Sequence, residues 1–178
     1  MIISIASLVW WISASPGDLS RLNSYAEQLN YGQLVKRLKA RENDSTNFTF
    51  VVLGDPKSKT SVASKVYERA ASEDPVVIFN TGDLVRVGNV DEYLTNYIPL
   101  LRIIDPVPMF CVPGNHDRGS RRDFKAFKKL FGGERFAFDY GPCRFIGFNT
   151  SETIRVSKDD LRFLDEIVSR IKSDDTDI

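Results

Sequence analysis

Three apolar runs, each followed by a loop that contains glycine, dominate the first part of the hydrophobic pattern. They span residues 48–53, 76–80 and 108–112, and each has the length of a buried strand. Between them, apolar positions recur at helical spacing in residues 60–74 and 90–104, although a proline interrupts the second segment. A strand, a helix and a second strand predict a right-handed parallel crossover, and here the unit is repeated.

The second part of the pattern has a different character. A basic segment at residues 121–131 has helical spacing, and two apolar runs at 135–140 and 143–149 are separated by only a glycine and a proline. Such a tight separation is typical of an antiparallel hairpin, and a last helix is predicted at residues 158–172. We therefore expect an α/β fold in which helices flank a mixed β-sheet, with a parallel first half and an antiparallel continuation.

The composition divides the chain into three parts. Residues 1–14 carry no charge and resemble the apolar region of an export signal, but no basic residue precedes them and the run is shorter than the ~20 residues that cross a bilayer. They are an apolar leader or its remnant, or else a buried first strand. Residues 15–47 predict a helical lead-in and a polar linker, and residues 48–178 one domain. Export or membrane tethering is expected only if the first part is a signal remnant; otherwise we expect the cytoplasm.

The charge composition predicts no overall electrostatic field. The 178 residues include 24 basic and 24 acidic side chains, and 42% of the residues are hydrophobic. A neutral chain is not drawn to nucleic acid, so the basic run at 118–129 favours a solvated helix face, and no nucleic-acid partner is expected. Two cysteines in apolar stretches, Cys111 and Cys143, are expected as buried free thiols, with a disulfide between two strands as the alternative.

The loops after the three predicted strands carry the candidate chemistry. In each loop a glycine precedes an acidic or amide side chain, and these are Asp55, Asp83 and Asn115. A single Gly-Asp pair is most often a plain turn, but three such pairs leave room for one helix and one strand between neighbours. Because the carboxyl ends of parallel strands meet at one edge of an open sheet, these oxygen donors should converge, and they suit a divalent cation. His116, the only histidine of the chain, lies in the third loop.

The order of these loops resembles the calcineurin-like metallophosphoesterase family. The motifs that carry the resemblance are Gly54-Asp55, Gly82-Asp83-Leu84 and Gly114-Asn115-His116-Asp117, the last being the most specific. Val112-Pro113 ahead of the last loop, Phe131-Gly132 after it and the following hairpin agree with it. The resemblance covers about residues 48–171. It implies a four-layer α/β/β/α sandwich, which we expect to be incomplete here, the domain being truncated before the later histidine motifs of the family.

The resemblance implies hydrolysis of a phosphate ester at a pair of divalent metal ions, which orient the phosphate and activate water. Carried onto this chain, it implies that Asp55 binds the first metal and Asp83 bridges both. It also implies that Asn115 gives its side-chain carbonyl to the second metal, and that His116 contacts the phosphate and protonates the leaving oxygen. The expected cofactors are therefore divalent ions (manganese, iron, zinc or magnesium), and the expected partner is a phosphate-ester substrate.

Three departures from the family pattern bear on these roles. The first loop of the family reads Asp, any residue, His, but here the third position is Lys57. A lysine there would lose its proton at a cost, turn outward, or replace the ion with a fixed ammonium, and we favour an outward or phosphate-facing side chain. The second loop continues into Arg86 instead of an acidic partner for the histidine, and Arg86 is either a phosphate contact or a plain surface arginine. Finally, the later histidines are absent, so metal binding is expected to be weak.

Two functions follow from these observations. The first is a metal-dependent phosphoesterase that hydrolyses a phosphate ester at a dinuclear metal centre. The second is a catalytically inactive phosphate-binding or interaction module of the same fold, with Lys57 and Arg86 as anion contacts. A nucleotide-binding P-loop is not indicated, because the segment at residues 57–60 lacks the two-glycine frame.

Overall fold

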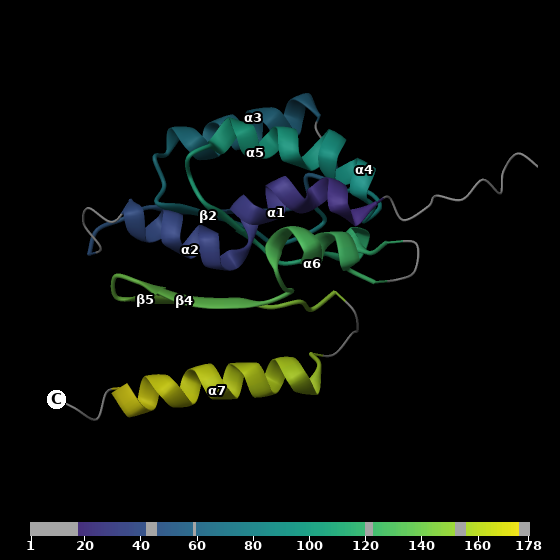
Figure 1. Cartoon of the computed structure of the whole chain (residues 1–178). Helices are drawn as coiled ribbons and strands as arrows, with labels where there is room; N and C mark the ends of the chain where they lie inside the picture. The colour runs from purple at the N-terminus through teal and green to yellow at the C-terminus, as the bar shows by residue number, and fades with distance from the viewer. Residues whose placement is uncertain (1–17, 42–45, 59, 120–122, 152–155, 175–178) are drawn as a thin grey trace, which may run out of the picture.

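The computed structural model describes residues 18–41, 46–58, 60–119, 123–151 and 156–174. The apolar segment at residues 1–14 lies outside these ranges, so its interpretation as a leader stays a prediction. Within the described ranges, no helix is both long and apolar enough to span a bilayer. Figure 1 shows the chain as stacked layers of helices and strands.

The first sheet has three parallel strands in sequence order. They are β1 (Phe50–Leu53), β2 (Val77–Asn80) and β3 (Met109–Cys111). Helix α3 (Ser61–Ser72) connects β1 to β2, and it begins where the Thr60 hydroxyl accepts a hydrogen bond from the main-chain N–H of Ala63. The predicted parallel crossovers are thus confirmed, and they bring the carboxyl ends of all three strands to one edge of the sheet.

The segment between β2 and β3 is a helix with an irregular middle. It consists of α4 (Val90–Glu92), the π-helical turn η3 (Tyr93–Tyr97) and α5 (Ile98–Ile104). The main-chain N–H of Ile98 donates to the carbonyl of Tyr93, five residues earlier. The interruption expected from Pro99 is confirmed, because proline has no N–H to continue the regular ladder. The π-turn directs both of its tyrosine side chains into the core.

The residues ahead of β1 form the short helix η2 (Leu19–Leu22) and the helices α1 (Asn23–Leu29) and α2 (Tyr31–Ala40). The break between α1 and α2 lies at Asn30, whose side chain accepts a hydrogen bond from the Gln33 N–H at 3.1 Å and so caps α2. The side chains of Leu22, Leu34 and Leu38 are buried, and the Tyr31 hydroxyl donates to the Cys111 carbonyl at 2.6 Å. Helix α2 therefore packs directly on the sheet.

A second sheet follows helix α6 (Lys125–Phe131), which ends at Gly132 in a left-handed conformation. It is the antiparallel hairpin of β4 (Phe136–Tyr140) and β5 (Cys143–Gly147). The hairpin is confirmed, but among the described residues it does not continue the parallel sheet as expected; it forms a separate two-stranded sheet. The physical reason is that alternate aromatic side chains of β4 are buried against Phe79 and Phe110, so the hairpin packs by its face.

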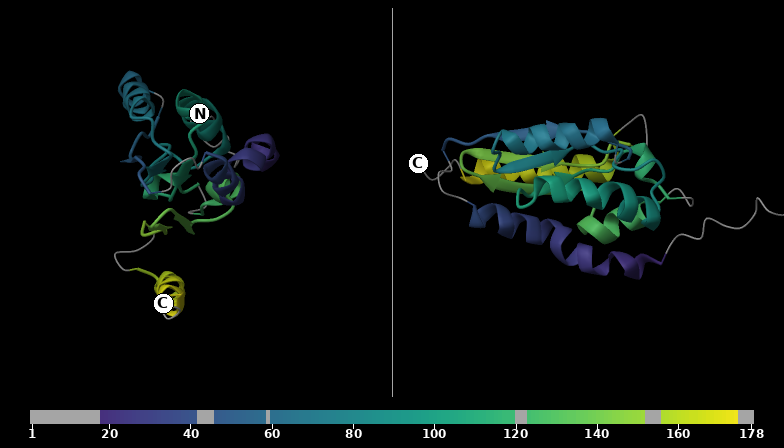
Figure 2. Two further views of the ribbon diagram at one scale, coloured as in Figure 1. Left: turned by 90° about the vertical axis from the view of Figure 1, so that its left-hand side faces the viewer. Right: turned by 90° about the horizontal axis from the view of Figure 1, so that it is seen from above.

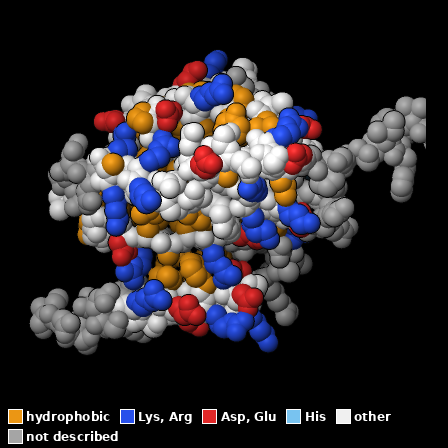
Figure 3. All heavy atoms as spheres, viewed as in Figure 1, with side chains coloured by type: hydrophobic (Ala, Val, Ile, Leu, Met, Phe, Trp, Pro, Cys, Tyr) orange, Lys and Arg blue, Asp and Glu red, His pale blue; other side chains and the backbone are white. Residues whose placement is uncertain are grey.

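Helix α7 (Lys158–Asp174) covers the outer face of the hairpin. The layer order is therefore helices, parallel sheet, hairpin and α7, as Figures 1 and 2 show, and the predicted α/β class is confirmed. The Arg135 guanidinium lies 5.4 Å from the centre of the Phe163 ring and donates to the carbonyl of Asp159. Figure 3 shows hydrophobic side chains gathered between α7 and the rest of the molecule, although Leu161 and Val168 stay exposed.

Both cysteines are free thiols, as predicted. Cys111 is completely buried on β3, where its sulfur lies 2.9 Å from the hydroxyl of Tyr97, and burial raises the pKa of the thiol. Cys143 lies on β5 and is half-buried, so only the first cysteine is as deeply buried as expected.

Candidate active site

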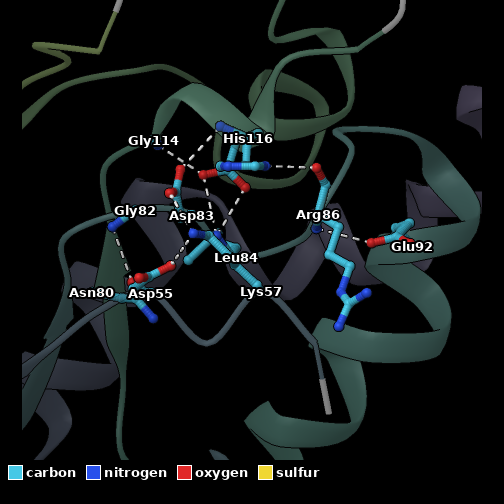
Figure 4. A network of polar contacts seen from close by, with 11 residues as sticks. Asp55, Lys57, Asn80, Gly82, Asp83, Leu84, Arg86, Glu92, Gly114 and His116 are labelled. Atoms are coloured by element: carbon cyan, nitrogen blue, oxygen red, sulfur yellow. Dashed lines mark hydrogen bonds and ion pairs between the residues drawn. The ribbon is translucent and has the colours of Figure 1, made fainter. Parts of the chain in front are cut away.

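The loops after β1, β2 and β3 are bonded to one another at one edge of the parallel sheet (Figure 4). The main-chain N–H groups of Asp55 and Lys57 donate to the carbonyls of Gly82 and Asp83, each at 3.0 Å. The main-chain N–H of His116 donates to Asp83 Oδ1 at 2.9 Å. The structure thus brings Asp55, Asp83 and His116 into one cluster, as parallel topology requires.

Two glycines allow this close approach. A Cβ on Gly114 would lie 2.1 Å from Asp83 Oδ1 and 2.3 Å from the main-chain nitrogen of Asp83. A Cβ on Gly82, which has a φ of +111°, would lie 2.5 Å from the nitrogen of Gly114. Any larger residue at either position would force the second and third loops apart.

The first two loops also contain non-glycine residues in the left-handed region. Asp55, Lys57 and Asp83 have φ values of 58°, 48° and 54°. Such conformations are uncommon for residues with a side chain, and they persist where the surrounding hydrogen bonds determine them. Three of them in one cluster are typical of a functional site, where they direct side chains that a regular loop would point elsewhere.

The side chain of Lys57 turns inward, against our expectation of an outward position, and its contact with phosphate stays a prediction. Its Nζ lies 3.1 Å from Asp55 Oδ1 and 3.7 Å from Asp83 Oδ2. Two neighbouring carboxylates attract the nearest cation, and Lys57 is two residues away from one of them in the same loop. The hydrogen bond to Asp55 raises the pKa of Lys57, so the side chain is an ammonium ion. Of a neutral lysine, an outward side chain and a fixed ammonium ion, the last agrees with the position of Lys57 in the structure.

The imidazole of His116 is oriented by a main-chain group. Its Nδ1 lies 2.9 Å from the carbonyl oxygen of Arg86. Because a carbonyl oxygen only accepts hydrogen bonds, Nδ1 carries the proton, and Nε2 is left to interact with a ligand. The second loop therefore orients the histidine without an acidic side chain.

The Arg86 side chain itself points away from Asp83 and His116 in Figure 4, and its main-chain N–H donates to Glu92 Oε2 at 2.9 Å. Its contact with phosphate stays a prediction. Asn115 is exposed and begins the turn η4 (Asn115–Asp117), beside His116. Its role as a metal ligand also stays a prediction.

Asp117 holds the loops together, a role that sequence reasoning missed. Its side chain is completely buried and accepts hydrogen bonds from the main-chain N–H of Gly114 at 2.7 Å, from that of Leu84 at 3.1 Å and from the Tyr93 hydroxyl at 3.0 Å. Burial raises the pKa of Asp117 to about 6, against the opposing effect of these donors. The motif marks this aspartate, but no local signal identifies donors that lie 24 and 33 residues away.

Comparison with known proteins places this arrangement in a family. The model of the calcineurin-like phosphoesterases matches residues 48–175. The chain belongs to the calcineurin-like phosphoesterase family. The resemblance seen in the sequence is thus confirmed, and no curated protein matches the chain.

Among solved structures, the fold of this calcineurin-like phosphoesterase chain is similar to that of the purple acid phosphatase PPD1 from seeds of yellow lupin (Lupinus luteus). The TM-score is 0.52 and the sequence identity is 18%. The alignment covers 70% of this chain and 28% of the plant phosphatase, so the chain spans well under half of that protein. At this identity the likeness concerns the fold.

Calcineurin-like phosphoesterases generally use divalent metal ions, but the described side chains of this member do not fit a pair of them. Among the described residues, no group of three or more His, Cys, Asp and Glu side chains is placed to hold a metal. Asp117 is engaged by three donors, and Asp55 and Asp83 face an ammonium ion. A dinuclear centre needs more donors than these loops bring together.

Proposed function

We propose that the protein is a phosphoesterase that binds a phosphate ester at the loop edge of the parallel sheet and hydrolyses it. The observation that supports this function most directly is the placement of His116. Its main chain is held by Asp83, and its ring is held by the Arg86 carbonyl. Family membership supports the same reaction class.

The proposed role of His116 is proton donation to the leaving oxygen of the ester. With Nδ1 bonded to the Arg86 carbonyl, a protonated ring presents Nε2–H as its second donor. A ring that is fixed at Nδ1 loses little freedom when the ester binds, so that proton transfer needs little reorganisation. Lys57 and Arg86 are our candidates for phosphate contacts, since each carries a positive charge on one of the loops that meet at this edge of the sheet.

Divalent ions (manganese, iron, zinc or magnesium) are part of the proposal as weakly bound ligands. Asp55, Asp83 and Asn115 are our candidates for their oxygen donors. Their affinity is expected to be low, because the described loops offer few donors and Lys57 faces two of them. The proton transfer proposed for His116 does not depend on how many ions bind.

Hydrolysis of an aryl phosphate with added Mn²⁺ tests the function. We expect measurable turnover by the wild type, and a fall of about a hundredfold or more for His116→Ala, the usual effect of losing a general acid. Asp83→Ala should reduce the rate as well, because it removes the acceptor of the His116 N–H. Asp91→Ala, which alters an exposed carboxylate, serves as the matched control. Equal rates in the wild type and Asp83→Ala would rule the function out for this chain.

The inward position of Lys57 favours a second candidate, a catalytically inactive module that binds phosphate or a phosphorylated partner. In this case the ammonium ion would keep metal ions from the two carboxylates, and the protein would bind phosphate without hydrolysing an ester. Calorimetry with inorganic phosphate separates the two functions. Phosphate binding without hydrolysis of the aryl phosphate supports the module, whereas stoichiometric and tight uptake of Mn²⁺ or Zn²⁺ defeats it.

A further inference from the structure

One ammonium ion is shared by the carboxylates of two different loops in the candidate active site. Lys57 Nζ lies within 4 Å of oxygens of both Asp55 and Asp83, at 3.1 and 3.7 Å. Of the three side chains, that of Asp83 is the most covered, with 18% of its surface exposed. A positive charge between two converging carboxylates stands where a bound cation would otherwise neutralise them.

The backbone holds Lys57 in this position. The residues on both sides of Pro56 donate main-chain hydrogen bonds to the second loop. The N–H of Asp55 donates to the carbonyl of Gly82, and the N–H of Lys57 donates to the carbonyl of Asp83. The proline between them restricts the chain further, because its ring fixes φ. Because the main chain of Lys57 is hydrogen-bonded to the loop that carries Asp83, its side chain is directed at the carboxylates.

We propose that the ammonium group of Lys57 is a built-in cation that replaces one metal ion between Asp55 and Asp83. Lys57 and a divalent ion then compete for the same carboxylate oxygens. The pair is partly exposed, with 38% of the Lys57 side chain accessible, so the ammonium ion weakens metal binding and does not abolish it. The inference rests on the proposed function for the location of the site, but it concerns metal binding and not turnover.

Calorimetric titration of the full chain with Mn²⁺ tests the competition between Lys57 and the metal ion. In Lys57→Met, a side chain of similar length without charge replaces the competitor, and the affinity for Mn²⁺ is expected to rise about tenfold or more, as Coulomb's law implies for a unit charge a few ångströms from a divalent ion. Lys57→Arg keeps the charge and should bind Mn²⁺ no more tightly than the wild type. Lys65→Met removes an exposed lysine of α3 and controls for net charge.

A second neutral variant, Lys57→His, adds a nitrogen ligand and should bind Mn²⁺ at least as tightly as Lys57→Met. Circular dichroism of each variant establishes that it is folded, and either neutral variant suffices for the comparison. Wild-type affinity in the folded neutral variants would overturn the inference, and so would tight stoichiometric uptake by the wild type. If the wild type does not hydrolyse the ester but Lys57→Met gains affinity for Mn²⁺, the proposed phosphoesterase function is wrong and the inference about Lys57 stands.

Discussion

Replacing Tyr93 with phenylalanine removes a single hydroxyl group beneath the candidate active site. The hydroxyl donates to Asp117 Oδ1 at 3.0 Å, and both side chains are completely buried. After the substitution, the main-chain N–H of Leu84 is the remaining donor to that oxygen, at 3.1 Å. No water-exposed surface is changed, so the loss of one hydrogen bond to a buried carboxylate accounts for the effect.

The expected magnitude follows from the nature of the acceptor. Hydrogen bonds to charged groups contribute about 1.5–3 kcal/mol, and bonds between neutral groups about 0.5–1.5 kcal/mol. We therefore expect Tyr93→Phe to lower the free energy of unfolding by about 2 kcal/mol. In the Asp117→Asn background the acceptor is a neutral amide, so the same substitution should cost about 1 kcal/mol.

Urea unfolding of the wild type, both single variants and the double variant measures this coupling as a double-mutant cycle. Tyr97→Phe is the matched control, because Tyr97 is equally buried in the same π-turn but its hydroxyl contacts the sulfurs of Met109 and Cys111. Its cost should be smaller than that of Tyr93→Phe. The reasoning is refuted if the two tyrosine variants lose equal stability, or if Tyr93→Phe costs the same in both Asp117 backgrounds.

Three further predictions concern the rest of the molecule. Gly114→Ala should lower the free energy of unfolding by about 2 kcal/mol or more in urea titrations, because its Cβ would lie 2.1 Å from a side-chain oxygen of the second loop. With a thiol reagent, the half-buried Cys143 should react in the native protein and Cys111 only after unfolding, and Cys143→Ser should abolish the native reaction. The hydrogen bonds from Arg144 lower the pKa of Asp139 below its ordinary value of 3.8. Asp139→Asn should therefore be less stable than the wild type at pH 6, and this difference in stability should disappear as the pH falls below the lowered pKa, where the wild-type carboxyl is protonated. A difference that persists at low pH would contradict an origin in the charge of Asp139.

The elements of the fold and the loops of the site could be predicted from the amino-acid sequence alone. Apolar periodicity and the effect of Pro99 act over a few neighbouring positions of the chain. The strands, the helices and the interrupted segment could therefore be predicted from the local pattern. The positions of Asp55, Asp83 and His116 at one edge followed as well, because a repeated parallel crossover leaves little choice of where the strands end.

The way in which these elements meet could not be predicted in this manner, because it depends on tertiary contacts. The hairpin packs by its aromatic face as a separate sheet, Lys57 turns toward two carboxylates, and Asp117 accepts a hydrogen bond from Tyr93. In each case, the outcome depends on contacts between segments far apart in the chain, which no local pattern contains. A buried side chain takes the partners that its neighbours in space provide, because an unpaired charge or polar group inside a protein is costly.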